Sequence, residues 1–253
     1  MILDGFRLDG KNALVTGSRR GLGAGIAVGL AEAGANVAVH GHDTPPLETA
    51  KAVRAAGRRA IELVGDVADA ATCPALVNAV VQELGSLDIL VNNAGIVRRS
   101  PAAEHPEADW ARVLEVNLTS VFRLSQLAGR HMLKQGRGKI INVASLLSFQ
   151  GGILVPGYAA AKGGVAQLTK ALANEWAAKG VNVNAIAPGY MVTDNTEALR
   201  QDPARSRQIL ERIPAGRWGT PQDLAGAAVF LASAASDYMH GHVVVVDGGW
   251  MAR

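Results

Sequence analysis

The sequence predicts an α/β fold: one domain built on a Rossmann-type, doubly wound parallel sheet of about seven strands with helices on both faces. Three observations support this fold class. Short apolar runs alternate with helix-forming stretches along the chain. The apolar runs are almost continuous, which is typical of parallel strands buried on both faces. No linker, repeat or low-complexity tract interrupts the sequence, so we expect a single domain over residues 1–253.

The expected strands and helices follow one another in strict alternation. The strands are expected at residues 12–16, 36–40, 60–65, 87–92, 139–144, 181–187 and 243–247. The helices are expected at residues 22–33, 45–56, 72–84, 108–134, 158–179 and 222–233. In such a sheet a ligand binds outside the carboxyl ends of the strands.

Composition excludes several classes of function. With 49% hydrophobic residues and 29 glycines, the chain can form a sizeable core with many tight turns. The net charge is +3 without a block of like charges, so nucleic-acid binding is not indicated. The single cysteine, Cys73, excludes an internal disulfide and fits a reducing compartment. Residues 1–10 have no signal-peptide pattern and no apolar run approaches 18 residues, so we expect a cytoplasmic protein without a membrane partner.

A glycine-rich turn follows the first expected strand. Gly17-Ser-Arg-Arg-Gly21-Leu-Gly23 stands between that strand and a helix-forming stretch that ends at Gly34. Glycine lets the backbone approach a ligand with no Cβ in the way. The helix N-terminus then offers free N–H groups and a positive dipole end to a pyrophosphate. The pattern predicts dinucleotide binding, with a plain strand-to-helix turn as the alternative.

Tyr158 and Lys162 lie four residues apart at the start of an expected helix, so the phenol and the ammonium share one face. Ser145 stands thirteen residues upstream at the end of an expected strand. A free tyrosine has a pKa of about 10, and a neighbouring positive charge lowers that pKa. The three side chains could therefore transfer protons to and from a carbonyl or alcohol oxygen. The alternative is a core tyrosine beside a solvated lysine.

Taken together, the motifs resemble those of the classical short-chain dehydrogenase/reductases. The matching motifs are Thr16-Gly17-x-x-x-Gly21-x-Gly23, Asn92-Asn93-Ala94-Gly95, Asn117, Ser145, Tyr158-x-x-x-Lys162 and Pro188-Gly189. They occur in the family's order over essentially the whole chain, and the combination is highly specific. The resemblance implies an enzyme that transfers a hydride between a nicotinamide cofactor and a ketone or secondary alcohol.

The resemblance also implies a role for each matched residue. Tyr158 would be the general acid/base, Lys162 would lower its pKa and hold the nicotinamide ribose, and Ser145 would stabilise the substrate oxygen. Asn117 would anchor a water to the lysine and complete a proton relay; alternatively, it is a buried asparagine that satisfies a helix kink. The expected cofactor-binding residues are Gly17, Arg20, Gly21, Leu22, Gly23, His40, Asp66, Val67, Asn93, Ala94, Gly95, Tyr158, Lys162, Pro188, Gly189 and Thr193.

Five further segments resemble one group within this family, the bacterial 2-deoxy-D-gluconate 3-dehydrogenases, also described as 2-dehydro-3-deoxy-D-gluconate 5-dehydrogenases. The segments are Ile96-Val-Arg98-Arg99, residues 145–152, residues 187–191, residues 213–219 and residues 247–253. This resemblance implies a sugar-acid substrate, 2-deoxy-D-gluconate or 2-dehydro-3-deoxy-D-gluconate, with a secondary alcohol or ketone as the reacting group.

The choice between NAD and NADP stays open at this point. An acid at the end of the second strand would bind the ribose 2′-hydroxyl and favour NAD, but the chain has His40-Gly-His42-Asp43 there. Arg20 occupies a place where a basic residue can meet a 2′-phosphate, which favours NADP. The resembling group mainly uses NAD and also lacks this acid, so the sequence leans weakly to NAD.

Candidate substrate-binding residues follow the fourth and later strands. Arg98 and Arg99 come just after the fourth strand, and an arginine fork suits a carboxylate, although both could be solvated loop residues. Gln150 and Asn195 are candidate partners for substrate hydroxyls. The polar, arginine-rich segment at about 190–221 breaks the alternation directly after a strand end, so we expect a substrate lid there.

Two histidine pairs have a spacing that places both side chains on one side of a strand. They are His40-x-His42 and His240-x-His242. No third ligand accompanies either pair, so we expect no metal site.

Two classes of function remain. The chain is either an enzyme or a catalytically silent dinucleotide sensor on the same fold, and the complete set of Asn117, Ser145, Tyr158 and Lys162 favours the enzyme. Within enzymes, the alternatives are a gluconate 5-dehydrogenase and a 3-oxoacyl-carrier-protein reductase.

The resemblance implies a homotetramer. The apolar tail 243–250 is then expected to be covered by a neighbouring subunit, unless Trp250 folds back on its own chain.

Overall fold

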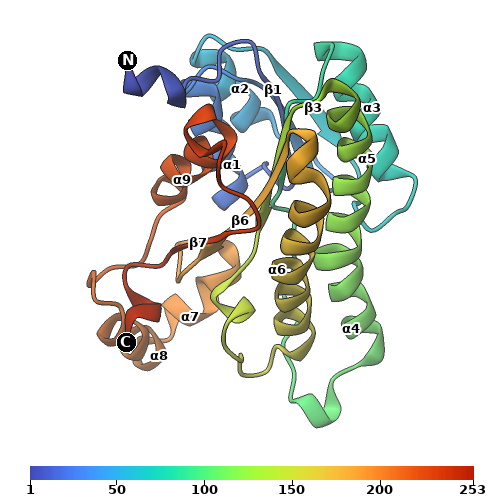
Figure 1. Cartoon of the computed structure of the whole chain (residues 1–253). Helices are drawn as coiled ribbons and strands as arrows, with labels where there is room; N and C mark the ends of the chain where they lie inside the picture. Colours follow the sequence, from blue (N-terminus) through green and yellow to red (C-terminus); the bar gives the residue numbers. More distant parts are fainter.

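Seven short apolar runs form the strands of one parallel sheet (Figure 1). The computed structural model describes residues 1–253. The strands are β1 (Asn12–Val15), β2 (Asn36–Gly41), β3 (Ala60–Val64), β4 (Ile89–Asn92), β5 (Gly138–Val143), β6 (Val181–Pro188) and β7 (Val243–Val246). Their order is β3-β2-β1-β4-β5-β6-β7, and every neighbouring pair is parallel. The predicted fold class is confirmed.

Helices cover both faces of the sheet, as the near-continuous apolar strands require (Figure 1). One face packs against α1 (Gly21–Glu32), α2 (Leu47–Ala55) and α9 (Gln222–Ala232). The other face packs against α3 (Thr72–Leu84), α5 (Ser120–Gln135) and α6 (Pro156–Trp176). None of the helices combines the length and the apolarity that a bilayer-spanning segment needs.

The strand order reverses at β1, which pairs with β2 on one side and β4 on the other. A crevice opens at this point because the connections from the two strands leave toward opposite faces of the sheet. The glycine turn after β1 and the Asn93 loop after β4 therefore lie next to each other at the carboxyl edge.

A π-helical turn (Glu115–Thr119) joins α4 (Glu107–Leu114) to α5, so the expected helix at 108–134 is continuous but locally widened. Asn117 lies in this turn and is fully buried. Such turns are rare and frequently occur at functional sites.

The segment at 190–221 is largely helical rather than an irregular loop. It contains α7 (Glu197–Gln201) and α8 (Pro203–Arg212), and the Asp202 carboxylate caps α8 by accepting the Ala204 and Arg205 N–H groups. Short 3₁₀ turns complete the chain at Ile2–Phe6, Ala102–Glu104, Leu146–Ser148, Ala177–Lys179, Asp194–Thr196, Ala234–Ser236 and Trp250–Ala252.

The C-terminal tail packs on its own chain, beside α8 (Figure 1). Trp250 is only 5% exposed in the isolated chain, and it forms a small apolar cluster with Leu146, Ile209 and Ile213. The Arg212 guanidinium lies 4.0 Å above the Trp250 ring. The expectation that Trp250 needs a neighbouring subunit to cover it is therefore wrong, because the lid segment already buries the ring.

Trp250→Ala should lower the free energy of unfolding by about 3–5 kcal/mol, because it leaves a cavity under α8. Tyr238→Ala is the matched control, since Tyr238 is fully exposed and its removal should change stability by no more than about 0.5 kcal/mol. Urea unfolding measures both. Equal midpoints for the two variants would show that the Trp250 cluster contributes nothing.

Candidate active site

The glycine turn after β1 packs directly on the loop after β4. Gly17 has φ +61°, and a Cβ there would lie 2.8 Å from the Ala94 Cα. A Cβ on Gly23 would lie 2.4 Å from both the Asn93 Nδ2 and the Gly17 carbonyl oxygen. Both positions therefore require glycine for close approach, and Gly17 requires it for its conformation as well. The helix that follows, α1, begins without a side-chain cap, which leaves its first N–H groups available to an anion.

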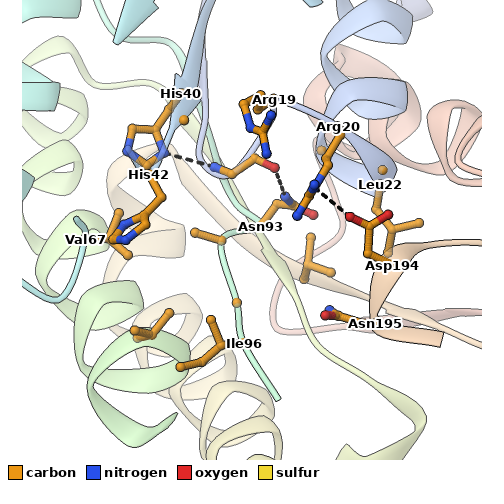
Figure 2. Close-up of a pocket in the computed structure, with 18 of the residues that line it drawn as sticks. Arg19, Arg20, Leu22, His40, His42, Val67, Asn93, Ile96, Asp194 and Asn195 are labelled. Atoms are coloured by element: carbon orange, nitrogen blue, oxygen red, sulfur yellow. Dashed lines mark hydrogen bonds and ion pairs between the residues drawn. The ribbon is translucent and has the colours of Figure 1, made fainter. Parts of the chain in front are cut away.

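Side-chain hydrogen bonds tie this turn to β4 (Figure 2). The Asn93 Nδ2 donates to the carbonyls of Thr16 and Gly17, both at 2.9 Å. The Thr16 hydroxyl accepts the N–H groups of Asn93 and Ala94 at 3.0 and 3.1 Å. The Asn93 side chain thus fixes the position of the turn by bonding two of its carbonyls.

On its other side the turn is bound by His40 at the end of β2 (Figure 2). The Gly17 N–H donates to the His40 Nδ1 at 3.0 Å, and the His40 Nε2 lies 2.9 Å from the Gly65 carbonyl oxygen after β3. His40 is 2% exposed, and burial lowers its pKa. Both ring nitrogens are therefore engaged with backbone groups.

The two arginines of the turn behave differently. The Arg20 Nε forms an ion pair with the Asp194 carboxylate of the lid segment at 2.8 Å (Figure 2). Arg19 forms no ion pair, and its Cδ lies close to Gly41 at the end of β2, 3.7 Å from where a Cβ on that glycine would be. The free guanidinium at the end of β2 therefore belongs to Arg19.

Asp66, after β3, is held by residues from other elements. Its carboxylate accepts the Ala68 N–H at 3.0 Å and the Arg112 guanidinium at 2.7 Å, and His42 lies 3.7 Å away. Partial burial raises the pKa of Asp66, but the Ala68 N–H and Arg112 outweigh it and hold the pKa below its ordinary value. Asp66 is therefore a carboxylate at neutral pH.

Tyr158, Lys162 and Ser145 come together where β5 ends and α6 begins. The Lys162 Nζ lies 5.7 Å from the centre of the Tyr158 ring and donates to the Val143 carbonyl at 2.5 Å. The Ser145 Oγ accepts the Leu147 N–H, and the Ser148 hydroxyl beside it donates to the Lys162 carbonyl. The predicted trio is thus assembled, and backbone contacts hold it.

The charges of this trio differ from the expectation. Burial raises the pKa of Tyr158, while Ser145 and Arg99 act in the opposite direction without overcoming it. Burial also lowers the pKa of Lys162 to about 8. Tyr158 therefore keeps its proton at neutral pH, with Ser145 and Arg99 acting in favour of the phenolate.

Asn117 stabilises the loop after β4. Its Nδ2 donates to the Ile96 carbonyl at 2.7 Å, and its Oδ1 accepts the Ile96 N–H at 2.8 Å. The Asn117 side chain forms no hydrogen bond with Lys162, which donates to Val143 instead. The alternative interpretation, a buried asparagine at a helix irregularity, thus describes the side chain.

The four predicted substrate residues are only partly brought together. The Arg99 guanidinium donates to the Asn195 carbonyl at 3.1 Å, and its charge acts to lower the pKa of Tyr158. Arg98 turns away and pairs with Asp109 at 3.4 Å. Asn195 lines the pocket described next, whereas Gln150 does not.

A pocket of about 430 Å³ opens at the carboxyl edge of the sheet, and Tyr158 and Lys162 line it but Ser145 and Asn117 do not (Figure 2). Fourteen of the sixteen predicted cofactor-binding residues line it; Pro188 and Gly189 do not. Lining residues that the sequence did not single out include Arg19, Arg112, Ile96, Val116 and Asp194. No spacing motif marks Arg112, which reaches the pocket from α4 through its ion pair with Asp66.

Comparison with known proteins matches this geometry to one family. Residues 17–251 match the family model described as "Enoyl-(Acyl carrier protein) reductase". The 2-dehydro-3-deoxy-D-gluconate 5-dehydrogenase of Dickeya dadantii is 57% identical over 100% of both chains. The chain belongs to the short-chain dehydrogenase/reductase family. It is an NAD(P)-dependent oxidoreductase, so the silent-sensor alternative is set aside.

Two solved members of the family share the fold and contain NADP. One, from Agrobacterium tumefaciens, is provisionally assigned as a 2-deoxy-D-gluconate 3-dehydrogenase; it is 55% identical, has a TM-score of 0.92, and is matched over 99% of this chain and 100% of its own. The other is a gluconate 5-dehydrogenase from Burkholderia cenocepacia in complex with NADP and tartrate, 44% identical with a TM-score of 0.94 over 100% of both chains. The resemblance to the family is confirmed.

Proposed function

We propose that this family member interconverts a secondary alcohol and a ketone on a six-carbon sugar acid, either 2-dehydro-3-deoxy-D-gluconate or 2-deoxy-D-gluconate. The observation that carries the proposal is the hydrogen bond from Arg99 to Asn195, which lines the same pocket as Tyr158, because it sets a carboxylate-binding group near a proton donor. The 57% identity to a 2-dehydro-3-deoxy-D-gluconate 5-dehydrogenase supports the same substrate class.

Tyr158 is the proposed general acid/base. Because burial keeps its phenol protonated at neutral pH, it can donate a proton to the substrate oxygen during ketone reduction. The Ser145 hydroxyl stabilises the charge that develops on that oxygen. The nicotinamide, when bound, supplies or accepts the hydride.

Lys162 is the proposed proton reservoir beside Tyr158. Its pKa of about 8 lies close to neutral, which is the range in which an acid/base group can both hold and release a proton. Both polar atoms of the Asn117 side chain are taken by Ile96. We therefore assign the anchoring of a water beside the lysine to the main chain of Asn117, which the π-turn supports because it disturbs the regular helical pairing of carbonyls.

The residues of the pocket fit a dinucleotide. The uncapped N-terminus of α1 suits the pyrophosphate, and the two close-packed glycines leave room for it. Asp66 and Val67 line the side next to β3, while Thr193 and Asn195 come from the lid. Pro188 and Gly189 stay candidates for contacts that follow lid movement, since the lid begins directly after them.

The residues at the end of β2 support binding of NADP. The 2′-position of the adenosine ribose lies near this strand end in such folds. Arg19 is there without an acidic partner, and the nearest acid along the chain, Asp43, is exposed. Although the group resemblance leant weakly to NAD, two solved relatives hold NADP. We therefore propose that NADP binds at least as tightly as NAD.

The lid, the assembly and the location are proposals as well. Asp194 pairs with Arg20 and the Asn195 carbonyl accepts from Arg99, which supports the segment 190–221 as a lid over both ligands.

A homotetramer is proposed from the family. A cytoplasmic location is proposed because the substrate class and the cofactor belong to central metabolism. Light scattering at working concentration tests the assembly: a mass near 26.3 kDa would contradict it.

The experiment that tests the function follows the absorbance of the reduced nicotinamide. The panel is 2-dehydro-3-deoxy-D-gluconate, 2-deoxy-D-gluconate, gluconate and an acetoacetyl thioester, each with the matching redox form of NAD and NADP. The highest kcat/KM is expected with one of the two deoxy sugar acids. A higher value with gluconate would favour a gluconate 5-dehydrogenase, and one with the thioester a carrier-protein reductase.

Tyr158→Phe should lower kcat by about two to four orders of magnitude, because it removes only the proton that is transferred. Dinucleotide affinity should stay within a factor of about three, since the ring remains. In the wild type, ketone reduction should decline as pH rises through about 8, where Lys162 loses its proton. Near-normal turnover in the variant would exclude the assigned role.

Arg99→Ala should raise the KM for the sugar acid by about tenfold or more, because a charged hydrogen-bond partner of the carboxylate is lost. Arg98→Ala is the matched control, since that guanidinium pairs with Asp109 and should leave the KM nearly unchanged. Steady-state kinetics on the preferred substrate measures both. Equal effects would mean that Arg99 does not bind the substrate.

Arg19→Ala should weaken NADP binding about tenfold or more, and NAD binding much less, because only NADP carries a 2′-phosphate. Arg20→Ala should show the same preference to a smaller degree, since its guanidinium must first leave Asp194. Calorimetric titration of each variant with both cofactors measures the ratio. A uniform loss would assign the arginine to the shared pyrophosphate or to structure alone.

A further inference from the structure

We propose that His40 is a positioning residue: its neutral imidazole holds the phosphate-binding turn, and its protonation releases the turn and weakens cofactor binding. The inference rests on the proposed dinucleotide site. It does not make His40 a contact of the cofactor, since the histidine acts through the backbone of Gly17 and Gly65.

The hydrogen bonds fix the state of the ring. A backbone N–H can only donate and a carbonyl can only accept. The Nδ1 therefore carries no hydrogen, because it accepts the Gly17 N–H at 3.0 Å, and the Nε2 carries the hydrogen that it donates to the Gly65 carbonyl at 2.9 Å. Only the neutral Nε2–H tautomer satisfies both contacts.

The backbone of His40 binds the same turn a second time. Its N–H donates to the Ser18 Oγ, and its carbonyl accepts the Ser18 N–H, both at 2.8 Å. The Ser18 hydroxyl in turn donates to the Val15 carbonyl at 2.7 Å. Every polar group of His40 is thus used to connect the turn after β1 with the end of β3.

The turn has no room to adapt when the ring changes. Opposite His40, a Cβ on Gly17 would already lie 2.8 Å from the Ala94 Cα, and Asn93 holds the Gly17 carbonyl. A second proton on His40 would direct an N–H at the Gly17 N–H across 3.0 Å. Because two donors repel, either the turn or the imidazole must move, and the N-terminus of α1 moves with the turn.

The surroundings set the pH at which this happens. Burial lowers the pKa of His40 from its ordinary value of 6.5, and His42 adds to this, while the Gly65 carbonyl and Asp66 oppose it. Arg19 lies at the same strand end and carries a further positive charge, and Arg112 neutralises much of Asp66. His40 is therefore largely neutral at neutral pH, and it becomes half protonated only below pH 6.5.

The sign of the effect follows from this direction. Binding needs the neutral form, so the dissociation constant is the intrinsic one divided by the neutral fraction. As pH falls below the pKa of His40, that fraction falls by up to about tenfold per pH unit, and the dissociation constant rises by the same factor. The same proton uptake also weakens the fold, since the unfolded chain binds it at higher pH.

The test compares wild type with His40→Asn. The asparagine Oδ1 can take the place of Nδ1 as acceptor for Gly17, but it does not titrate. Calorimetric titration with NAD⁺ is carried out from about pH 5 to about pH 7.5. NADP⁺ is titrated at neutral pH alone, because its 2′-phosphate is a phosphate monoester that itself titrates at about pH 6. The wild-type dissociation constant should rise at the acid end, and that of the variant should stay within about twofold. The remote His242→Asn should keep the wild-type profile, and His42→Asn should keep an acid limit at slightly higher pH, because His42 lowers the pKa of His40.

A spectroscopic measurement identifies the group directly. In ¹⁵N-histidine-labelled protein, the signal that disappears in His40→Asn should have the Nε2–H tautomer and stay neutral to lower pH than exposed histidines. An Nδ1–H tautomer, or an acid limit that survives in His40→Asn or vanishes in His42→Asn, overturns the inference while leaving the cofactor site intact. A wild type that binds neither cofactor at neutral pH overturns both.

Discussion

The close packing of the glycine turn against the loop after β4 is the contact on which the rest of the site depends. At Gly17 and Gly23 a single added carbon would meet Ala94 or Asn93 at less than 3 Å. Because β1 and β4 are neighbours at the point where the strand order reverses, this contact defines the floor of the crevice. The orientation of α1, and with it the direction of its N–H groups, follows from the position of this turn.

Burial then decides the chemistry of the catalytic end. Tyr158 and Lys162 lie in a region where removing water disfavours their charged forms, so the phenol keeps its proton and the ammonium holds its proton less firmly. The two pKa values, which are close together in water, are thereby moved apart, with that of Tyr158 above that of Lys162. Between the two groups the proton therefore favours the phenol, which keeps Tyr158 able to donate to a substrate oxygen.

The sequence predicts the fold better than it predicts the arrangement of individual side chains. All seven strands and the main helices form where the apolar pattern indicates, because burial on both faces leaves parallel strands little freedom. Arg98 and Arg99 are equivalent in the sequence, yet one pairs with Asp109 and the other donates to the Asn195 carbonyl. Likewise, Arg20 meets Asp194 across more than 170 residues of chain. Such pairings depend on tertiary contacts that no local spacing encodes.

The proposed lid, residues 190–221, is joined to the rest of the molecule by two kinds of contact. Toward the pocket it is held by the exposed Arg20–Asp194 pair and the Arg99–Asn195 bond, and exposed pairs of this kind contribute at most about 1 kcal/mol. On its outer side, Ile209 and Ile213 pack on Trp250 and Leu146, and such buried contacts cost several times more to break. The inner contacts can therefore exchange for ligand contacts while the outer cluster keeps its packing. Since Leu146 directly follows Ser145, the same cluster that anchors the proposed lid also supports Ser145.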